Sequence, residues 1–175
     1  VRMDIKEELK KAMEWLAEQP DAIFVGQNIV YPENQMYRNL IDIPDDKKFE
    51  MPVAEEMQMG VSIGLALEGY IPVSIYPRFD FLILATNQIV NHLDKLRYLY
   101  RDNDSAKVII RTAVGGTKPL DAGPQHTKNH TEAFRLMCPS INVVEVTKPE
   151  DILPTYQEAY SATDSYLIVE NWNGN

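Results

Sequence analysis

Four side chains could together bind an aromatic nitrogen heterocycle and exchange a proton with it. They are a carboxylate, two aromatic rings and an imidazole: Glu55, Phe79, Phe81 and His126. Aromatic rings provide a stacking wall for a heterocycle, and a carboxylate buried among apolar groups holds a proton more readily than one in water. Such a carboxylate could share a proton with a ring nitrogen, and the histidine could act as a second acid or base. The four residues therefore predict a small-molecule acid/base site.

Each of these residues also has a simpler interpretation. A glutamate in the first turn of a helix interacts favourably with the helix dipole, so Glu55 could serve helix stability alone. Phe79 and Phe81 could be core residues. His126 follows Gly-Pro-Gln in a predicted loop, where a lone histidine is usually solvated. The residue types by themselves leave both interpretations open.

The stretch 51–69 is expected to position the carboxylate. Its sequence, MPVAEEMQMGVSIGLALEG, predicts a helix that begins near Glu55, with the neighbouring Glu56 on its surface. Three apolar residues share one face of this helix: Met59, Ile63 and Ala66. Gly60 and Gly64 each cost about 1 kcal/mol relative to alanine inside a helix, so we expect their small size to permit close packing against another helix or a ligand.

The remaining patterns predict an α/β fold. Short apolar runs predict strands at 22–26, 71–76, 107–114, 141–146 and 166–170. Helical periodicity or start signals predict helices at 5–19, after Phe81, near 132–137 and at 149–163. Apolar strands that alternate with helices predict a single three-layer α/β/α domain with a mostly parallel sheet over residues 1–175. Residues 27–50 lack periodicity and predict a long, functional loop.

The candidate residues converge on one edge of this predicted sheet. Ligands of parallel sheets bind beyond the carboxyl ends of the strands. The predicted loops that follow those ends carry Gln27, Phe79, Phe81 and His126, and Glu55 opens the helix beside them. This convergence favours a binding site.

Composition excludes several classes of protein. The net charge of −9, with no basic cluster, argues against nucleic-acid binding. Cys138 is the single cysteine, so no disulfide can form within the chain.

His92 is expected on the surface and His130 at a helix start, and neither has a second ligand at metal-binding spacing. With no signal peptide or apolar run long enough to span a membrane, we expect a cytoplasmic protein.

Four segments, taken in order, resemble a known superfamily. They are PVAEEMQMGVSIGLALEGYIPV, FDFLILATNQIVN, GPQHT and CPSINVVEVTKPED. The order and spacing of these segments are similar to the pyrimidine-binding domain of transketolase-type thiamine-diphosphate enzymes. The greatest similarity is to the β subunits of 2-oxo-acid dehydrogenases, and it extends over nearly the whole chain.

The resemblance implies a role for each candidate residue. Glu55 matches the glutamate that hydrogen-bonds the pyrimidine N1′ of thiamine diphosphate and so activates the cofactor. Phe81 matches the ring that packs on the aminopyrimidine, with Phe79 as a further wall, and His126 matches a histidine that faces the substrate. Gln27 lies in the loop beside the cofactor, where Gln27-Asn28 replaces the acidic pair usual in β subunits. Leu84 also stands where related subunits have a polar residue.

The half of the site that binds the diphosphate is missing from the sequence. No G-D-G motif is present, and the segment D-A-G-P at 121–124 does not replace it. No sequence remains for the C-terminal domain of β subunits, although the tail NWNGN is typical of the start of a linker. The resemblance therefore implies a hetero-oligomer, with two copies each of this chain and of an α-type, diphosphate-binding subunit. That subunit would carry Mg²⁺ and share the cofactor.

Three functions follow from these observations. The first is an enzyme subunit for 2-oxo-acid decarboxylation or for transketolase-like two-carbon transfer from a ketose. The second is a non-catalytic assembly or regulatory domain that keeps the same fold. The third, a generic nucleotide-binding protein, lacks support because no G-x-G-x-x-G or P-loop follows a predicted strand.

Overall fold

A computed structural model describes residues 4–31, 38–99, 106–118 and 121–173. Three parts of the segments discussed above lie outside the described residues. They are 32–37 of the predicted long loop, 119–120 of the loop before His126, and 174–175 of the tail.

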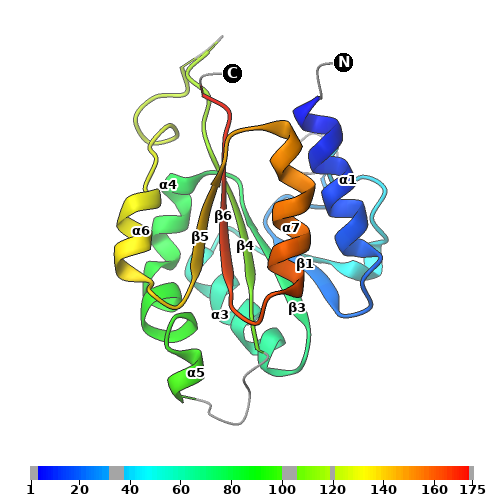
Figure 1. The fold of residues 1–175 in the computed structure, drawn as a ribbon, viewed down its shortest axis with the longest axis vertical. Coiled ribbons are helices and arrows are strands. Elements are labelled where there is room, and N and C mark those ends of the chain that lie inside the picture. The colour runs from blue at the N-terminus through cyan, green and yellow to red at the C-terminus, as the bar shows by residue number, and fades with distance from the viewer. Residues whose placement is uncertain (1–3, 32–37, 100–105, 119–120, 174–175) are drawn as a thin grey trace.

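One parallel sheet forms the centre of the molecule (Figure 1). Its strands are β1 (Ala22–Gly26), β2 (Lys48–Glu50), β3 (Ile71–Tyr76), β4 (Ile109–Val114), β5 (Asn142–Val146) and β6 (Tyr166–Asn171). They lie in the order β2-β1-β3-β4-β6-β5, and all neighbouring pairs are parallel. Phe24 pairs with Val73, and Ile110 pairs with Leu167, so apolar residues face one another along the centre of the sheet. The predicted fold class is confirmed.

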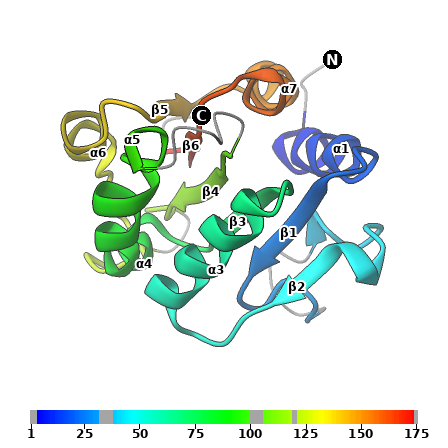
Figure 2. The same cartoon turned by 90° about the horizontal axis from the view of Figure 1, so that it is seen from below.

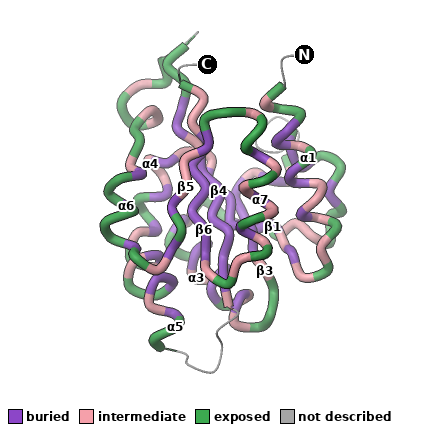
Figure 3. Tube along the Cα trace, viewed as in Figure 1, coloured by how far each residue is buried: buried purple, intermediate pink, exposed green. Residues whose placement is uncertain are grey.

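Helices cover both faces of the sheet (Figure 2). One face carries α1 (Ile5–Ala17) and α7 (Ile152–Ser161), which follows the short turn η4 (Pro149–Asp151). The other carries α3 (Glu55–Leu67), α4 (Phe79–Leu82) and α6 (Thr131–Met137). Burial is concentrated in the strands and on the inner helix faces, which produces one apolar core on each side of the sheet (Figure 3). Among the described helices, none has the length and apolar character needed to cross a bilayer.

The helix predicted to begin near Glu55 is confirmed as α3, both in its position and in its buried face. It begins at Glu55, and Met59, Ile63 and Ala66 are all buried in the core. The described residues do not place another helix in close contact with the two glycines, and packing against a ligand stays a prediction. A Cβ on Gly60 would meet only the Gln88 side chain, at 3.9 Å, and one on Gly64 would meet nothing within 4 Å.

Two predictions about loops are wrong. The segment 27–50 is not a loop throughout, because it ends in the turn η1 (Asp45–Lys47) and in β2, which pairs with β1 at the edge of the sheet. Strand β2 has only three residues, two of them charged, which is too short for an alternation signal. Phe79 and Phe81 lie in the short helix α4 and not in a loop.

The single amphipathic helix predicted after Phe81 is divided into several short pieces. They are η2 (Ile83–Ala85), the π-helix η3 (Gln88–Leu93) and α5 (Leu96–Leu99). The π-turn ends where the Asp94 N–H donates to the Ile89 carbonyl at 2.9 Å, a bond that spans five residues.

Candidate functional site

Glu55 and Gln27 meet in the interior beyond the carboxyl ends of β1 and β2. Gln27 directly follows β1, and Glu55 begins α3 a few residues after β2. The Gln27 Nε2 donates to the Glu55 Oε1 at 3.3 Å, and the two residues are only 4% and 6% exposed. The Gln27 Oε1 is enclosed and has no hydrogen-bond donor among the described residues. The pair therefore combines a carboxylate with an unsatisfied amide oxygen.

Helix α3 is attached to the sheet by a buried polar side chain one turn after Glu55. The Gln58 Nε2 donates to the Ile75 carbonyl at 3.0 Å and to the Ser74 Oγ at 3.2 Å. The Tyr76 hydroxyl donates to the Glu55 carbonyl at 3.3 Å, and burial raises the pKa of Tyr76, so that hydroxyl keeps its proton at neutral pH. These bonds fix the position of the Glu55 backbone relative to the end of β3.

A second carboxylate holds the loop that carries Gln27. The Glu50 side chain accepts hydrogen bonds from the N–H groups of Asn28, Ile29 and Val30, at 2.6, 2.9 and 3.2 Å. Asn28 has a φ of 59°, a left-handed conformation that turns these N–H groups toward one point. Glu50 thus orients the turn immediately after Gln27.

Of the other three candidates, Phe81 and His126 form a pair at the edge of the sheet, and Phe79 lies in the core. The rings of Phe81 and His126 contact edge to face, with centroids 5.3 Å apart. Phe79 is fully buried, and its ring packs against Phe134 and His130, each at 5.4 Å between centroids. The structure therefore brings Phe81 and His126 together, whereas Phe79 has the surroundings of a core side chain.

The loop that carries His126 is held by Asp80 of α4. The Asp80 carboxylate accepts from the Lys128 N–H at 3.2 Å and lies 3.3 Å from the His130 Nε2. His130 is the N-cap residue of α6, as expected for a helix start, and His92 is exposed on η3.

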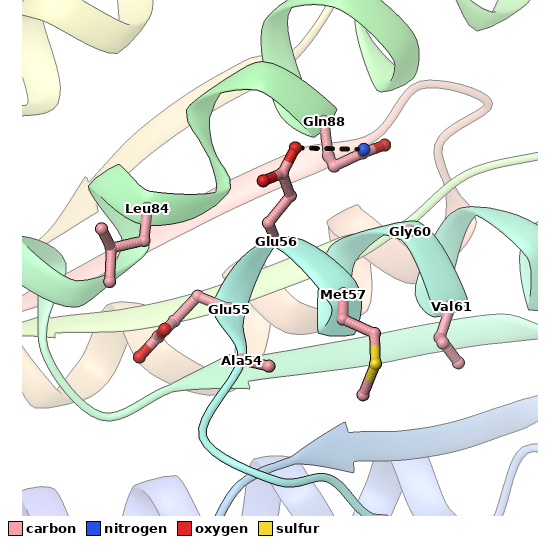
Figure 4. Close-up of a pocket in the computed structure, with 8 residues that line it drawn as sticks. All are labelled: Ala54, Glu55, Glu56, Met57, Gly60, Val61, Leu84 and Gln88. Atoms are coloured by element: carbon pink, nitrogen blue, oxygen red, sulfur yellow. Dashed lines mark hydrogen bonds between the residues drawn. The ribbon is translucent and has the colours of Figure 1, made fainter.

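An open groove of about 780 Å³ lies beside Glu55, between the first turns of α3 and the segment that contains η2 and η3 (Figure 4). It is lined by Ala54, Glu55, Glu56, Met57, Gly60, Val61, Leu84 and Gln88. Glu56 is exposed, as predicted, and its Oε1 accepts hydrogen bonds from Asn87 at 2.9 Å and from Gln88 at 3.5 Å. Leu84 is 63% exposed at the rim. The groove thus offers an apolar wall next to a buried carboxylate.

Several residues that shape the site were missed from sequence. The side chains of Glu50, Gln58 and Tyr76 hydrogen-bond to partners 16 to 33 residues away, and no local pattern marks such bonds. The boundary signals near the short run of residues 48–50 were Pro44 before it and Pro52 after it. For Tyr76, the position at the end of an apolar strand could have indicated a hydroxyl at the edge of the sheet.

Cys138 and metal chemistry have no support in the described residues. Burial raises the pKa of the Cys138 thiol to about 12, so it is protonated and unreactive at neutral pH. Within the described ranges, no three His, Cys, Asp or Glu side chains cluster closely enough to hold a metal ion.

Adding a methyl group at Gly115 is expected to displace the His126 loop. A Cβ there would overlap the His126 carbonyl oxygen and lie 3.3 Å from the Arg78 Nε. Overpacking of this kind costs about 1–3 kcal/mol, so Gly115→Ala should lower the melting temperature and change the NMR signals of the His126 ring. Gly116→Ala is the matched control, because its nearest neighbour would be the Lys118 carbonyl at 3.5 Å. Unchanged His126 signals in Gly115→Ala would contradict this account of the loop.

The sequence matches the family described as "Transketolase, pyrimidine binding domain" over residues 2–171. The chain is 29% identical over 126 residues to the 3-methyl-2-oxobutanoate dehydrogenase subunit beta of Mycobacterium tuberculosis. It is 32% identical over 127 residues to the pyruvate dehydrogenase E1 component subunit beta of Gracilaria tenuistipitata var. liui. These alignments cover 71% and 73% of this chain but only 35% and 38% of the relatives. The chain thus matches about a third of the length of these proteins.

Solved structures show the same fold at lower identity. A split-gene transketolase described as an inactive β4 tetramer superposes with a TM-score of 0.71 at 17% identity, covering 99% of this chain and 53% of that one. A transketolase from Campylobacter jejuni gives a TM-score of 0.72 at 16% identity, covering 94% of this chain and 25% of that one.

Proposed function

Because the chain belongs to the transketolase pyrimidine-binding domain family, we propose that it is the pyrimidine-binding subunit of a split thiamine-diphosphate enzyme. The observation that carries the proposal is the buried contact between Glu55 and Gln27 at the N-terminus of α3. Within the described residues, the Glu55 carboxylate forms no ion pair with a cationic side chain. Such a carboxylate suits a ligand that brings its own hydrogen-bond donors.

The described residues fit an aminopyrimidine. Glu55 supplies a carboxylate for a ring nitrogen, and the enclosed Gln27 Oε1 is an acceptor that an N–H donor could satisfy. The groove beside them has an apolar wall, which suits a flat heterocycle (Figure 4). When bound, thiamine diphosphate supplies the nucleophilic carbon that attacks the substrate carbonyl. In this proposal, Glu55 holds a proton at the pyrimidine nitrogen, and Gln27 orients the carboxylate of Glu55.

The aromatic candidates take different roles in this proposal. Phe81 packs on the aminopyrimidine and also contacts His126, which would transfer a proton at the substrate. Phe79 supports this arrangement from the core, through Phe134 and His130. Neither phenylalanine lines the open groove beside Glu55.

In this proposal, a second chain completes the site. We propose a single pyrimidine-binding domain at 1–175 that joins an α-type subunit, two copies of each, with the diphosphate and Mg²⁺ held by that subunit. The names of the relatives favour a 2-oxo acid as substrate, and the transketolase structures keep a ketose as the alternative. We place the assembly in the cytoplasm.

Calorimetric titration of thiamine diphosphate with Mg²⁺ tests the proposal. We expect tight binding only when the chain is mixed with its diphosphate-binding partner, because each chain supplies half of the site. Association of the two chains without cofactor binding would instead favour the non-catalytic assembly function. Turnover of a 2-oxo acid by the purified chain alone would refute the shared site.

A further inference from the structure

Arg78 lies at the same edge of the sheet as the proposed site. It follows β3 by two residues and is half-buried at the N-cap position of α4. Its Nη1 donates to the adjacent Pro77 carbonyl at 2.7 Å, while its Nε is enclosed and has no acceptor among the described residues. A buried donor without an acceptor is unfavourable, and a hydrogen bond to a ligand oxygen would remove that cost.

Like the exposed Arg38, Arg78 forms no ion pair with a carboxylate within the described ranges, but Arg78 is half-buried and its Nε is enclosed. Arg111 is held by Glu170, Arg97 by Asp164 and Arg135 by Glu132. No ion pair within the described ranges includes Arg78, although the chain has a net charge of −9 and many carboxylates were available to it. The nearby Asp80 is already engaged by the Lys128 N–H and by His130.

The surroundings of Arg78 connect it to His126. Its Nε lies next to Gly115, the first residue after β4, and would be 3.3 Å from a Cβ at that position. The His126 carbonyl lies against the same Gly115, so Arg78 and the backbone of His126 flank a single residue. The His126 ring in turn contacts Phe81. A cation with a free donor is therefore placed beside the histidine to which we assign contact with substrate.

We propose that Arg78 recognises an oxyanion of the substrate, either a carboxylate or a phosphate. The identification of this ligand as the substrate rests on the proposed function. A guanidinium presents planar N–H donors that match two oxygens of such a group, whereas a lysine provides a point charge without this geometry. Arg78 is thus a specificity residue, distinct from Glu55 and Gln27, which face the cofactor.

NMR of the arginine side-chain Nε–H signals tests the site directly, with inorganic phosphate and malonate as separate probes. We expect the Arg78 signal, identified by its absence in Arg78→Lys, to shift saturably with at least one probe. A response to phosphate alone indicates a phosphorylated substrate, and a response to malonate alone indicates a carboxylate. Arg97→Gln, which changes an ion-paired arginine elsewhere, should leave the shift unchanged. No saturable shift with either probe would overturn the proposal.

Kinetics of the assembled enzyme provide the second measurement. Arg78→Gln should raise KM for the anionic substrate by about 10-fold or more while kcat changes little, since a lost ionic hydrogen bond corresponds to about 1.5–3 kcal/mol. Arg78→Lys should recover part of that loss. An equal KM in Arg78→Gln would refute the assignment. Because the NMR test requires no cofactor, it can succeed even if thiamine diphosphate does not bind.

Discussion

The Glu55→Gln variant is expected to lose turnover by a factor of about 10²–10⁴ in the assembled enzyme, the range typical of a lost general acid or base. Glutamine keeps the size of the side chain but cannot hold a shared proton at the pyrimidine nitrogen. Helix α3 should remain in place, since Gln58 and Tyr76 attach it to β3 without using the Glu55 carboxylate. Steady-state kcat, circular dichroism and sedimentation with the partner measure activity, fold and assembly separately.

The adjacent glutamate supplies the control for that experiment. Glu56 lies in the same helical turn, but it is exposed and its carboxylate accepts hydrogen bonds from Asn87 and Gln88 across the groove. Although Glu56 lines the groove, its side chain points away from that of Glu55, toward Gln88 (Figure 4), so Glu56→Gln should retain nearly normal kcat. Full activity in Glu55→Gln, or an equal loss in both variants, would exclude the proposed proton contact.

The central strands were predictable because their signal is local and strong. The runs at 22–26 and 71–76 are apolar and bounded by turns, and the structure has β1 and β3 at those positions. The edge strand β2 was missed because pairing with β1, and not its own composition, makes it a strand. The segment after Phe81 was predicted as one helix because periodicity does not distinguish a continuous helix from the η2, η3 and α5 pieces.

The proximity of Gln27 and Glu55 was predictable, whereas most other contacts of the candidate residues were not. The carboxyl-end rule for parallel sheets placed Gln27 beside Glu55, and a hydrogen bond joins them in the structure. The spacing of Phe79 and Phe81 did not show which of the two rings lies in the core. In α4, the Phe79 ring packs into the core and the Phe81 ring contacts His126. The Glu50 hydrogen bonds depend on the left-handed turn at Asn28, a conformation that asparagine adopts more often than most residues but that its presence alone does not predict.

A buried charge network on the other side of the sheet also went unpredicted from the sequence. Arg111 of β4 is fully enclosed, with its Nε 2.6 Å from the Glu170 Oε1 and its Nη2 2.9 Å from the Asn39 Oδ1. The Tyr156 hydroxyl donates to the same Glu170 oxygen at 2.8 Å. Asn39 belongs to the segment between β1 and β2, so this network connects that segment to the centre of the sheet.

Removing the negative charge from this network should strongly destabilise the fold. Glu170→Gln leaves the Arg111 cation buried without a counter-charge, which typically costs about 3–5 kcal/mol. For a chain of this size, that corresponds to a decrease in melting temperature of about 10 °C. Urea unfolding followed by circular dichroism gives the change in free energy. The exposed Arg135–Glu132 pair is the control, and Glu132→Gln should cost less than about 1 kcal/mol.

A double variant distinguishes loss of charge balance from loss of hydrogen bonds. Adding Arg111→Met to Glu170→Gln removes the unpaired cation, while the amide oxygen introduced by Glu170→Gln can still accept from Tyr156. If the buried charge causes the instability, the double variant should be more stable than Glu170→Gln alone, because an apolar replacement of a buried ion pair is often close to neutral. If hydrogen bonding dominates, the double variant should be less stable than either single variant, since Asn39 would also lose its donor. The second result would contradict the electrostatic explanation and assign this network to hydrogen bonding.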